Sequence, residues 1–359
     1  MSGGTIGIAG AGLLGRLLAW RLGRAGYRVS VFDPAPGPAA RFGVHGEGQH
    51  AAGFTAAGML SPLAELETAG PRVAELGWRS IDLWREIAQA LGIEHGFVQH
   101  GSLMLAHRND LGAAQRVLAR LSQSTHPRAS AQALDPSRLL ALEPALQGAA
   151  HAWLLPDEAH VDPVAIMTAL QAQAPNTQWH WNHRVVTVEP GCMALENGDS
   201  PQFDLVFDVR GTGARPSLPV RGVRGEIAWL HLAAHGLTRP VRLLHPRHRV
   251  YLVPRDENTV VVGASEIESE DRSPASVRSV VELLSAAYSV MPALAEARVT
   301  RLDTNLRPAL PDNEPLLDAT PRCVRINGLF RHGWLLAPAL VSDALSACGA
   351  LDSLCEVSA

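Results

Sequence analysis

The sequence predicts an α/β protein (α+β overall) in which a Rossmann-type dinucleotide-binding domain carries an inserted antiparallel, β-rich domain. The first observation behind this prediction is a glycine-rich turn that directly follows an apolar, β-rich run at the N-terminus. The second is a change of pattern in mid-chain, where closely spaced strand-like segments replace alternating strands and helices. Strand-to-glycine segments then resume at residues 204 and 325. The nucleotide-binding domain is therefore expected to be discontinuous along the chain.

The N-terminal turn has the composition of a phosphate cradle. Residues 5–9 predict a buried parallel strand, and Gly10-Ala11-Gly12-Leu13-Leu14-Gly15 follows at once. Gly10 allows the tight turn, and Gly12 lets a pyrophosphate approach the backbone. Gly15 lets the following helix pack closely on the strand. The spacing therefore predicts dinucleotide binding.

The elements after this turn support the same prediction. Leucines at helical spacing predict a helix over residues 13–24, whose N-terminus offers free N–H groups and roughly half a positive charge to phosphates. A second strand over 28–32 delivers Asp33, about 20 residues beyond the glycines, where an acid binds ribose hydroxyls. An acid there disfavours a 2′-phosphate but leaves both FAD and NAD open.

The rest of the chain divides by pattern into two kinds of segment. Apolar periodicity predicts helices over 73–91, 111–121, 134–142, 163–174 and 277–290, and strands over 103–106, 184–188, 204–209, 226–232, 249–254 and 259–264. The last three strands are expected to be antiparallel. We expect a cofactor domain from residues 1–90, 150–215 and 305–359, and a substrate domain from 91–149 and 216–304.

Composition excludes several classes of protein. A length of 359 residues allows about two domains, and a net charge of −4 gives no basic footprint for nucleic acid. All 31 basic residues are arginines, because the sequence contains no lysine. A pyridoxal Schiff base and a Walker-type phosphate loop, which both need lysine, are therefore excluded.

Cysteine spacing and hydropathy bear on the cellular compartment. The four cysteines, at positions 192, 323, 348 and 355, show no CxxC spacing, so neither a zinc site nor a disulfide framework is predicted. The histidines show no metal-ligand spacing either, and we expect no metal. No apolar stretch is long enough to span a membrane, and the first apolar run is the predicted strand rather than a leader. We expect a cytoplasmic protein with reduced thiols.

Two arginines stand in the C-terminal part beside a glycine-rich turn. Leu306-Arg307-Pro308 precedes the run Asn327-Gly328-Leu329-Phe330-Arg331-His332-Gly333-Trp334-Leu335-Leu336-Ala337-Pro338, which opens an apolar helix. An arginine presents a planar fork of donors that matches a carboxylate. With the N-terminal cradle, these residues indicate a flavin enzyme that binds a carboxylate substrate and holds its cofactor between both ends of the chain.

With these segments in place, the chain resembles the glycine oxidase branch of the D-amino-acid-oxidase-like flavoenzymes, and in particular the thiamine-biosynthesis type. The resemblance covers nearly the whole length and implies a D-amino-acid-oxidase/glutathione-reductase-2-like fold. Its motifs, in chain order, are Ala56-Ala57-Gly58-Met59-Leu60, His160-Val161-Asp162-Pro163, Gly225-Glu226, Tyr251-Leu252-Val253-Pro254-Arg255, Val261-Val262-Gly263-Ala264, Leu306-Arg307-Pro308-Ala309-Leu310-Pro311-Asp312 and Arg331 to Pro338.

The resemblance implies a non-covalent FAD and the residues that hold it. These cofactor contacts are Gly10, Gly12, Leu13, Leu14, Gly15, Asp33, Pro34, Ala57, Gly58, Met59, Val185, Phe330, Arg331, His332, Gly333, Trp334 and Leu335. It further implies that Arg307 binds the substrate carboxylate, that Tyr251 assists it, and that Arg331 reaches both substrate and flavin.

The implied reaction is oxidative deamination of glycine or another small amine-bearing carboxylate. Glycine would give an imine, which hydrolyses to glyoxylate and ammonia or supplies thiazole formation in thiamine biosynthesis. Molecular oxygen would accept the electrons and form hydrogen peroxide. The implied partners are a small amino acid and oxygen, and we expect a homo-oligomer of a subunit count that the sequence does not give.

Departures from the family pattern leave alternatives open. Ala52-Gly53-Phe54 replaces the usual Ser or Thr pair, His332 stands where many relatives have Asn, and Trp334 replaces a smaller aliphatic residue. Trp334 either faces the substrate and favours small amines, or packs the last helix in the core. The alternatives are a sarcosine or D-amino-acid oxidase, a quinone-linked dehydrogenase, an NAD-dependent dehydrogenase, and a non-catalytic flavin- or metabolite-binding protein.

Overall fold

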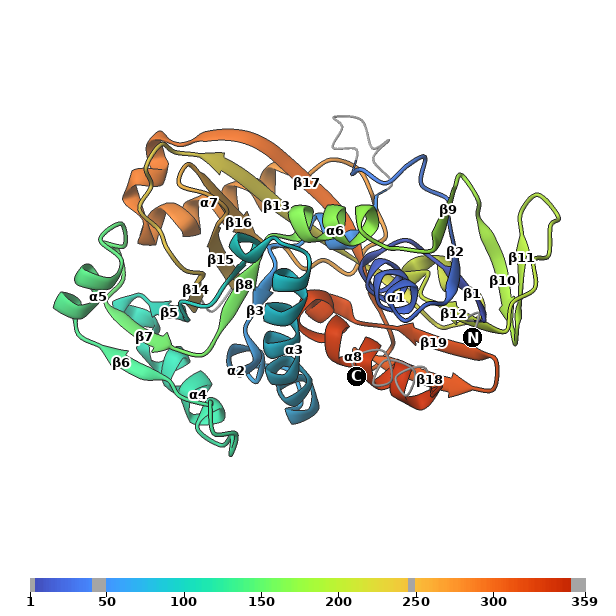
Figure 1. Ribbon diagram of the computed structural model, residues 1–359. Helices are drawn as coiled ribbons and strands as arrows, with labels where there is room; N and C mark the ends of the chain where they lie inside the picture. Colours follow the sequence, from blue (N-terminus) through green and yellow to red (C-terminus); the bar gives the residue numbers. More distant parts are fainter. Residues whose placement is uncertain (1–3, 41–49, 245–248, 350–359) are drawn as a thin grey trace.

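Two large sheets organise the chain, a mainly parallel one and a mainly antiparallel one (Figure 1). The computed structural model describes residues 4–40, 50–244 and 249–349. The two sheets form the two lobes of an elongated molecule, and helices lie between them and on their outer sides (Figure 1).

The first sheet has six strands in the order β18-β19-β12-β1-β2-β9. The bounds are β1 Thr5–Ala9, β2 Arg28–Asp33, β9 Thr177–Trp181, β12 Leu205–Asp208, β18 Leu316–Thr320 and β19 Cys323–Asn327. Strand β1 pairs in parallel with both β2 and β12, and β18 pairs antiparallel with β19 at one edge. Parallel strands with apolar residues on both faces require cover on both sides. Helices cover one face of this sheet, and the hairpin of residues 185–195 packs on the other.

Four helices pack together beside this sheet. They are α1 (Leu13–Arg24), α3 (Pro71–Ala90), α6 (Pro163–Ala172) and α8 (Gly333–Ala347). Helix α1 contacts α6 and α8, and α8 packs along α3. Their apolar stripes share one core; Leu17, Leu18, Ile81 and Leu336 are fully buried there. Because α8 joins β19 to this core, the C-terminal motif lies beside the N-terminal turn.

The second sheet has eight strands in the order β17-β13-β16-β15-β14-β5-β7-β6. The bounds are β5 Ser102–Ala106, β6 Gln132–Leu134, β7 His151–Leu155, β13 Arg221–His231, β14 Val241–Leu244, β15 Arg249–Pro254, β16 Thr259–Gly263 and β17 Arg298–Ala309. Alternate residues point to opposite faces. Ala228, Val262 and Leu252 lie opposite one another and join the core that α7 (Val277–Val290) covers. The other face is left for the site.

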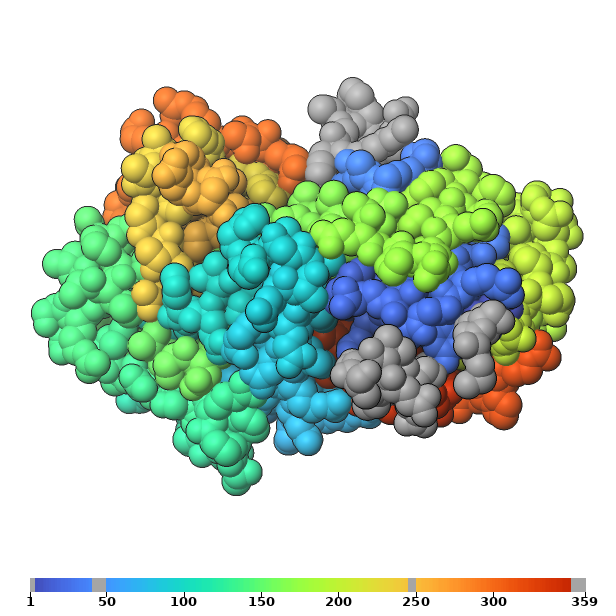
Figure 2. All heavy atoms as spheres, in the orientation of Figure 1, coloured from blue at the N-terminus to red at the C-terminus, as the bar shows by residue number. Residues whose placement is uncertain are grey.

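The remaining elements connect the two sheets. They are α2 Pro62–Glu65, α4 Leu111–Leu121, α5 Pro136–Leu142, the three-stranded sheet of β3 Met59–Leu60, β8 Ala159–Val161 and β4 Phe97–Val98, and the hairpin of β10 Val185–Glu189 and β11 Cys192–Leu195. Six short 3₁₀ helices, among them η1 Ala52–Phe54 and η6 Phe330–His332, complete the described chain. In the space-filling view the atoms of α3 (cyan) and α6 (green) form a continuous surface between the lobes (Figure 2).

The predicted fold class is confirmed, and the differences are local. The N-terminal strand–helix–strand unit, the antiparallel strands β13, β15 and β16, and helix α7 lie close to their predicted positions. A strand was expected before Arg307, but the bounds of β17 were not predicted, because charged residues such as Arg298, Arg301 and Asp303 interrupt its apolar alternation. Both β7 and the end of β17 belong to the eight-stranded sheet, although their residues fall within ranges expected for the cofactor domain.

The helices and the cysteines of the described chain bear on membrane insertion and thiol chemistry. Over the described ranges, no helix is both long enough and apolar enough to cross a bilayer. Cys192 and Cys323 are free thiols, and Cys355 lies outside the described residues.

Candidate active site

A cavity of about 1310 Å³ lies between the two sheets and reaches from the N-terminal turn to the start of α8. With one exception, every residue expected to contact cofactor or substrate lines it: Gly10, Gly12, Leu13, Leu14, Asp33, Pro34, Ala57, Gly58, Met59, Val185, Tyr251, Arg307, Phe330, Arg331, His332, Gly333, Trp334 and Leu335. The exception is Gly15. The structure therefore brings residues from both ends and the middle of the chain to one place.

The N-terminal turn forms one end of this cavity. Gly10 has a φ of +105°, and its N–H donates to the carbonyl of Phe32 at 2.8 Å. A Cβ atom on Gly12 would meet only the side chain of Ala51, at 3.6 Å, so the backbone there is open to the cavity. No side chain caps the N-terminus of α1, which leaves N–H groups of its first turn available to an anion.

Asp33 and Gly15 fix the shape of the turn. The Asp33 carboxylate accepts hydrogen bonds from the N–H groups of Ala11 at 2.6 Å and Ala35 at 2.8 Å, while it also lines the cavity. A Cβ on Gly15 would lie 1.9 Å from the carbonyl oxygen of Gly10. Gly15 thus serves helix packing and does not line the cavity, in agreement with the packing role that its place in the motif predicts.

Arg16 is a residue of this region that the sequence analysis missed. Its buried guanidinium donates to the carbonyl oxygens of Ala11 at 2.9 Å, Met167 at 2.7 Å and Pro38 at 2.6 Å. Burial lowers the pKa of Arg16 to about 10, so it stays charged behind the turn. An arginine among the leucines of an otherwise apolar helix was the available signal, since a buried charge needs partners.

Two alanine substitutions in the turn should separate packing from cofactor binding. Gly12→Ala places a methyl group in the open cradle, so we expect normal stability and FAD binding weakened about tenfold or more. Gly15→Ala forces a collision with Gly10, so we expect a loss of about 1–3 kcal/mol in stability of the apoprotein. Urea unfolding of the apoproteins and FAD titration measure the two effects. Equal stability losses in both variants would contradict this division of roles.

The start of α8 forms the opposite part of the cavity wall. Phe330 has a φ of +49°, an uncommon backbone conformation for a bulky residue, and Gly333 begins the helix. The N-terminus of α8 has no side-chain cap, so a second set of helix N–H groups opens onto the same space. A cradle for phosphates at α1 and a positive helix end at α8 fit an FAD, whose pyrophosphate and ring both carry electron-rich groups.

Tyr251, Arg242 and Arg307 project from one face of the eight-stranded sheet. Tyr251 lies directly opposite Arg242 on β14 and opposite Gly263 on β16. Opposite residues of antiparallel strands share a face, with Cβ atoms roughly 5 Å apart. A Cβ on Gly263 would lie 2.6 Å from the Tyr251 hydroxyl oxygen, so glycine is required for the ring to lie over the sheet. Arg242, which lines the cavity, is a second missed residue.

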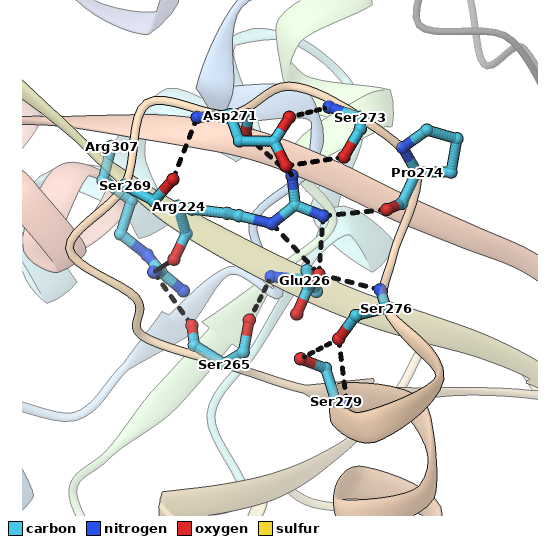
Figure 3. Close-up of polar contacts among 10 residues, drawn as sticks. All are labelled: Arg224, Glu226, Ser265, Ser269, Asp271, Ser273, Pro274, Ser276, Ser279 and Arg307. Atoms are coloured by element: carbon cyan, nitrogen blue, oxygen red, sulfur yellow. Dashed lines mark hydrogen bonds and ion pairs between the residues drawn. The ribbon is translucent and has the colours of Figure 1, made fainter.

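Arg307 is held by carbonyl oxygens alone. Its Nη1 donates to the carbonyl of Ser265 at 3.0 Å and to that of Arg224 at 3.3 Å (Figure 3). A Cβ on Gly225 would lie 2.5 Å from the guanidinium, so Gly225 leaves the space that it fills. Among the described residues, no carboxylate lies within 4.0 Å of it, and burial lowers its pKa. The fork therefore has donors left for an anion.

A buried ion pair braces the strand that orients Arg307. Arg224 donates to Glu226 at 2.7 Å and to the carbonyls of Asp271 at 2.7 Å and Pro274 at 2.8 Å (Figure 3). Glu226 also accepts from the N–H of Ser276 at 3.1 Å. These contacts hold the segment after β16 against strand β13. The carbonyl of Arg224 on that strand accepts a hydrogen bond from Arg307.

Glu65 forms ion pairs with the other two cavity-lining arginines near Tyr251. Its carboxylate accepts from Arg242 at 2.8 Å and from Arg331 at 2.7 and 3.1 Å, and Arg331 also approaches Glu266 at 3.3 Å. Burial opposes ionisation of Glu65, yet the field of Arg331, Arg242 and His332 outweighs it and holds its pKa well below the usual range. Arg331 is thus ion-paired, and no sequence signal indicated Glu65.

His332 is neutral at physiological pH. Burial lowers its pKa to about 4, against the opposing attraction of Glu65, whose Oε2 lies 3.4 Å from Nδ1. The nearby cations Arg331 and Arg242 disfavour its protonation further. The ring therefore presents a neutral surface to the cavity that it lines.

His332→Asn should make the protein less sensitive to acid. The unfolded chain takes up a proton near pH 6.5 and the folded one only near 4, so His332 lowers stability as the pH falls through this window. Between pH 7 and pH 5 the free energy of unfolding should fall by about 2 kcal/mol less in the variant than in the wild type. Urea unfolding at both pH values measures it; His160, with a pKa of about 3, contributes equally to both proteins. Identical pH dependence would contradict the assignment.

Trp334 is buried at the junction of α8 and α3. Only 4% of it is exposed, its ring lies 5.1 Å from that of Trp84, and its Nε1 donates to the carbonyl of Gly53 at 3.0 Å. The residue also borders the cavity. These contacts support the packing interpretation for most of the ring.

Within the ranges that the structure describes, no three or more His, Cys, Asp or Glu side chains are grouped so as to hold a metal ion.

A mixed sheet with a glycine-rich βα turn, joined to an antiparallel sheet that presents arginines over a shared cavity, defines an FAD-binding oxidoreductase. Comparison with known proteins gives the family: the profile described as FAD dependent oxidoreductase matches residues 5–344. The chain belongs to this family of FAD-dependent oxidoreductases.

Three relatives are informative. The chain is similar to the putative thiamine biosynthesis oxidoreductase ThiO of Rhizobium etli, with 40% identity over 94% of each chain. It is 25% identical to the glycine oxidase of Bacillus licheniformis, over 92% of this chain and 89% of that one. Its fold matches that of the glycine oxidase from Geobacillus kaustophilus with a TM-score of 0.80, at 23% identity over 96% and 95% of the two chains.

Proposed function

We propose that this protein oxidises glycine, or a closely related small amine that bears a carboxylate, with FAD as its cofactor. The observation that carries the proposal is Arg307, a cavity-lining guanidinium on the same sheet face as Tyr251. Within the part of the chain that the structure describes, its hydrogen bonds go to carbonyl oxygens alone. The names of the relatives from Rhizobium etli and Bacillus licheniformis point to the same chemistry.

Binding and orientation are the work of the chain's own residues. Arg307 would hold the substrate carboxylate through two parallel N–H donors. Tyr251 would donate a hydrogen bond from its hydroxyl group to the same carboxylate, because burial raises its pKa and keeps the phenol protonated. The Gly10–Gly15 turn and the start of α8 would hold FAD, which when bound accepts a hydride from the substrate Cα. Fixing the carboxylate limits the positions that Cα can take.

The proton balance needs no protein base if the amine arrives neutral. Loss of a hydride from Cα of the neutral amine leaves a protonated imine, and hydrolysis converts it to glyoxylate, ammonia and a proton. Two electrons pass to molecular oxygen, so glycine, water and oxygen give glyoxylate, ammonia and hydrogen peroxide. The neutral His332 adds no charge near the reacting nitrogen.

The name of the Rhizobium etli relative supports a place in thiamine biosynthesis. We propose that the imine formed here can also serve thiazole formation. Cytoplasmic location and assembly as a homo-oligomer belong to the same proposal; gel filtration with light scattering measures the assembly.

Oxygen consumption by the purified holoenzyme tests the proposed activity. With glycine we expect uptake of oxygen, formation of one equivalent each of glyoxylate and hydrogen peroxide, and a yellow protein that releases FAD on acid treatment. Faster turnover of sarcosine or D-alanine would assign one of the related oxidases. Reduction of a quinone analogue without oxygen uptake would assign a dehydrogenase. A colourless protein that binds NADH would contradict the proposal.

A further inference from the structure

Of the arginines that line the cavity, three lie near Tyr251: Arg242, Arg307 and Arg331. Among the residues described, Arg307 is the one of these three without a carboxylate partner. Arg242 and Arg331 both bind Glu65, whereas Arg307 contacts carbonyl oxygens. Arg331 and Arg307 are close enough for each charge to affect the pKa of Tyr251, as is Arg242. Arg255 also acts on Tyr251, but it donates to the carbonyls of Val161 and Ala57 and is not part of the cavity lining. The buried carboxylate of Glu65 therefore decides how many of the three cavity-lining arginines near Tyr251 can bind a ligand.

We propose that Glu65 is a specificity-determining residue that confines the site to substrates with one carboxylate. By occupying Arg242 and Arg331, it prevents them from forming a second carboxylate subsite beside Arg307. The inference rests on the proposed function, because it takes Arg307 as the carboxylate-binding residue.

The helix that carries Glu65 is held in place by hydrogen bonds to other elements. Helix α2 ends at Glu65, and the N–H of the preceding Ala64 donates to the buried carboxylate of Glu158 at 3.0 Å. Glu158 in turn accepts from the hydroxyl of Ser102 on β5 at 2.5 Å. The helix that carries Glu65 is therefore anchored to the eight-stranded sheet from which Arg242 projects.

Glu65 interacts more strongly with the arginines than Glu266, the other acid of the cluster, does. The Glu65 side chain is 11% exposed and accepts from two arginines, while Glu266 is 46% exposed and approaches Arg331 alone at 3.3 Å. Solvent screens an exposed ion pair much more than a buried one. Removing the Glu65 charge should thus free both Arg242 and Arg331 to bind a ligand. Removing the Glu266 charge should only weaken one of the two ion pairs of Arg331.

Titration of the bound flavin's visible spectrum with non-oxidisable acids tests the inference without turnover. Wild type should bind acetate and bind malonate or succinate no more tightly. Glu65→Gln should bind the better dicarboxylate at least about tenfold more tightly relative to acetate, because one charge-assisted contact is gained. Turnover of iminodiacetate relative to glycine should rise in the same direction. Glu266→Gln should show a smaller gain, and Glu65→Asp, which keeps the charge, none.

A charge-balanced variant protects the test against loss of folding. Glu65→Gln combined with Arg242→Gln removes one charge of each sign and still releases Arg331, so it should retain a severalfold gain for the dicarboxylate. An unchanged dicarboxylate-to-acetate ratio in this folded, flavin-loaded variant or in Glu65→Gln overturns the inference. Failure of the proposed function looks different: wild type would then not bind acetate, or Arg307→Lys would bind it as tightly.

Discussion

Replacing Arg307 with lysine is expected to raise the KM for glycine about tenfold to a hundredfold while FAD stays bound. Lysine keeps the positive charge but loses the two-pronged geometry, at a cost of roughly 1–3 kcal/mol. The ammonium group would also have to replace the contacts of Arg307 with the carbonyls of Ser265 and Arg224. The effect should fall on KM more than on kcat, because the carboxylate is held before and during the reaction.

Steady-state kinetics and flavin content of the purified variants measure this effect. Arg298→Lys is the matched control, since Arg298 begins the same strand, is exposed, and lies away from the cavity. We expect the control to keep the wild-type KM. An unchanged KM in Arg307→Lys, with normal FAD content, would mean that Arg307 does not bind the carboxylate.

Trp334→Ala is expected to cost about 3–5 kcal/mol of stability through the cavity that it leaves. The ring packs against Trp84, and its N–H satisfies the carbonyl of Gly53. On this packing interpretation, the ratio of kcat/KM for glycine to that for D-alanine or a larger D-amino acid should not change. If the ring instead limits the substrate pocket, the variant should gain relative activity on the larger substrates.

Urea unfolding and the three kcat/KM values distinguish these outcomes. Trp179→Ala is a useful control, because Trp179 is only partly buried on β9, outside the cavity lining. It should lose less stability and keep the same substrate ratios. A stable Trp334→Ala with a shifted ratio would contradict the packing interpretation.

The cofactor end of the site could be predicted from sequence because its determinants are local. The glycines, the helix and Asp33 lie within one strand–helix–strand unit, and each follows from a simple steric or electrostatic requirement. Arg307 and Tyr251 came from their motifs, and the sheet register brings both to one face. Each lies beside a glycine of the neighbouring strand, Gly225 or Gly263, that makes room for it.

The ion-pair cluster could not be predicted in the same way. Glu65 and Arg242 are 177 positions apart, and Glu65 stands on a four-residue helix without a motif. An arginine inside the apolar run of β14 indicated only that some buried partner must exist. The bounds of strand β17 could not be predicted for a related reason, because its charged residues interrupt the apolar alternation. Arg301 and Asp303 pair with each other at 2.9 Å, and Trp229 on β13 donates to Asp303.

Anaerobic reduction of the bound flavin tests the central claim most directly. Mixing the holoenzyme with glycine in the absence of oxygen should bleach the visible flavin absorbance, release glyoxylate and ammonia, and restore the colour when oxygen is admitted. The same experiment with Arg307→Lys should require much more glycine for the same rate. A yellow protein whose absorbance is unchanged by glycine, sarcosine and D-alanine would contradict the account and identify a flavin-binding protein without this activity.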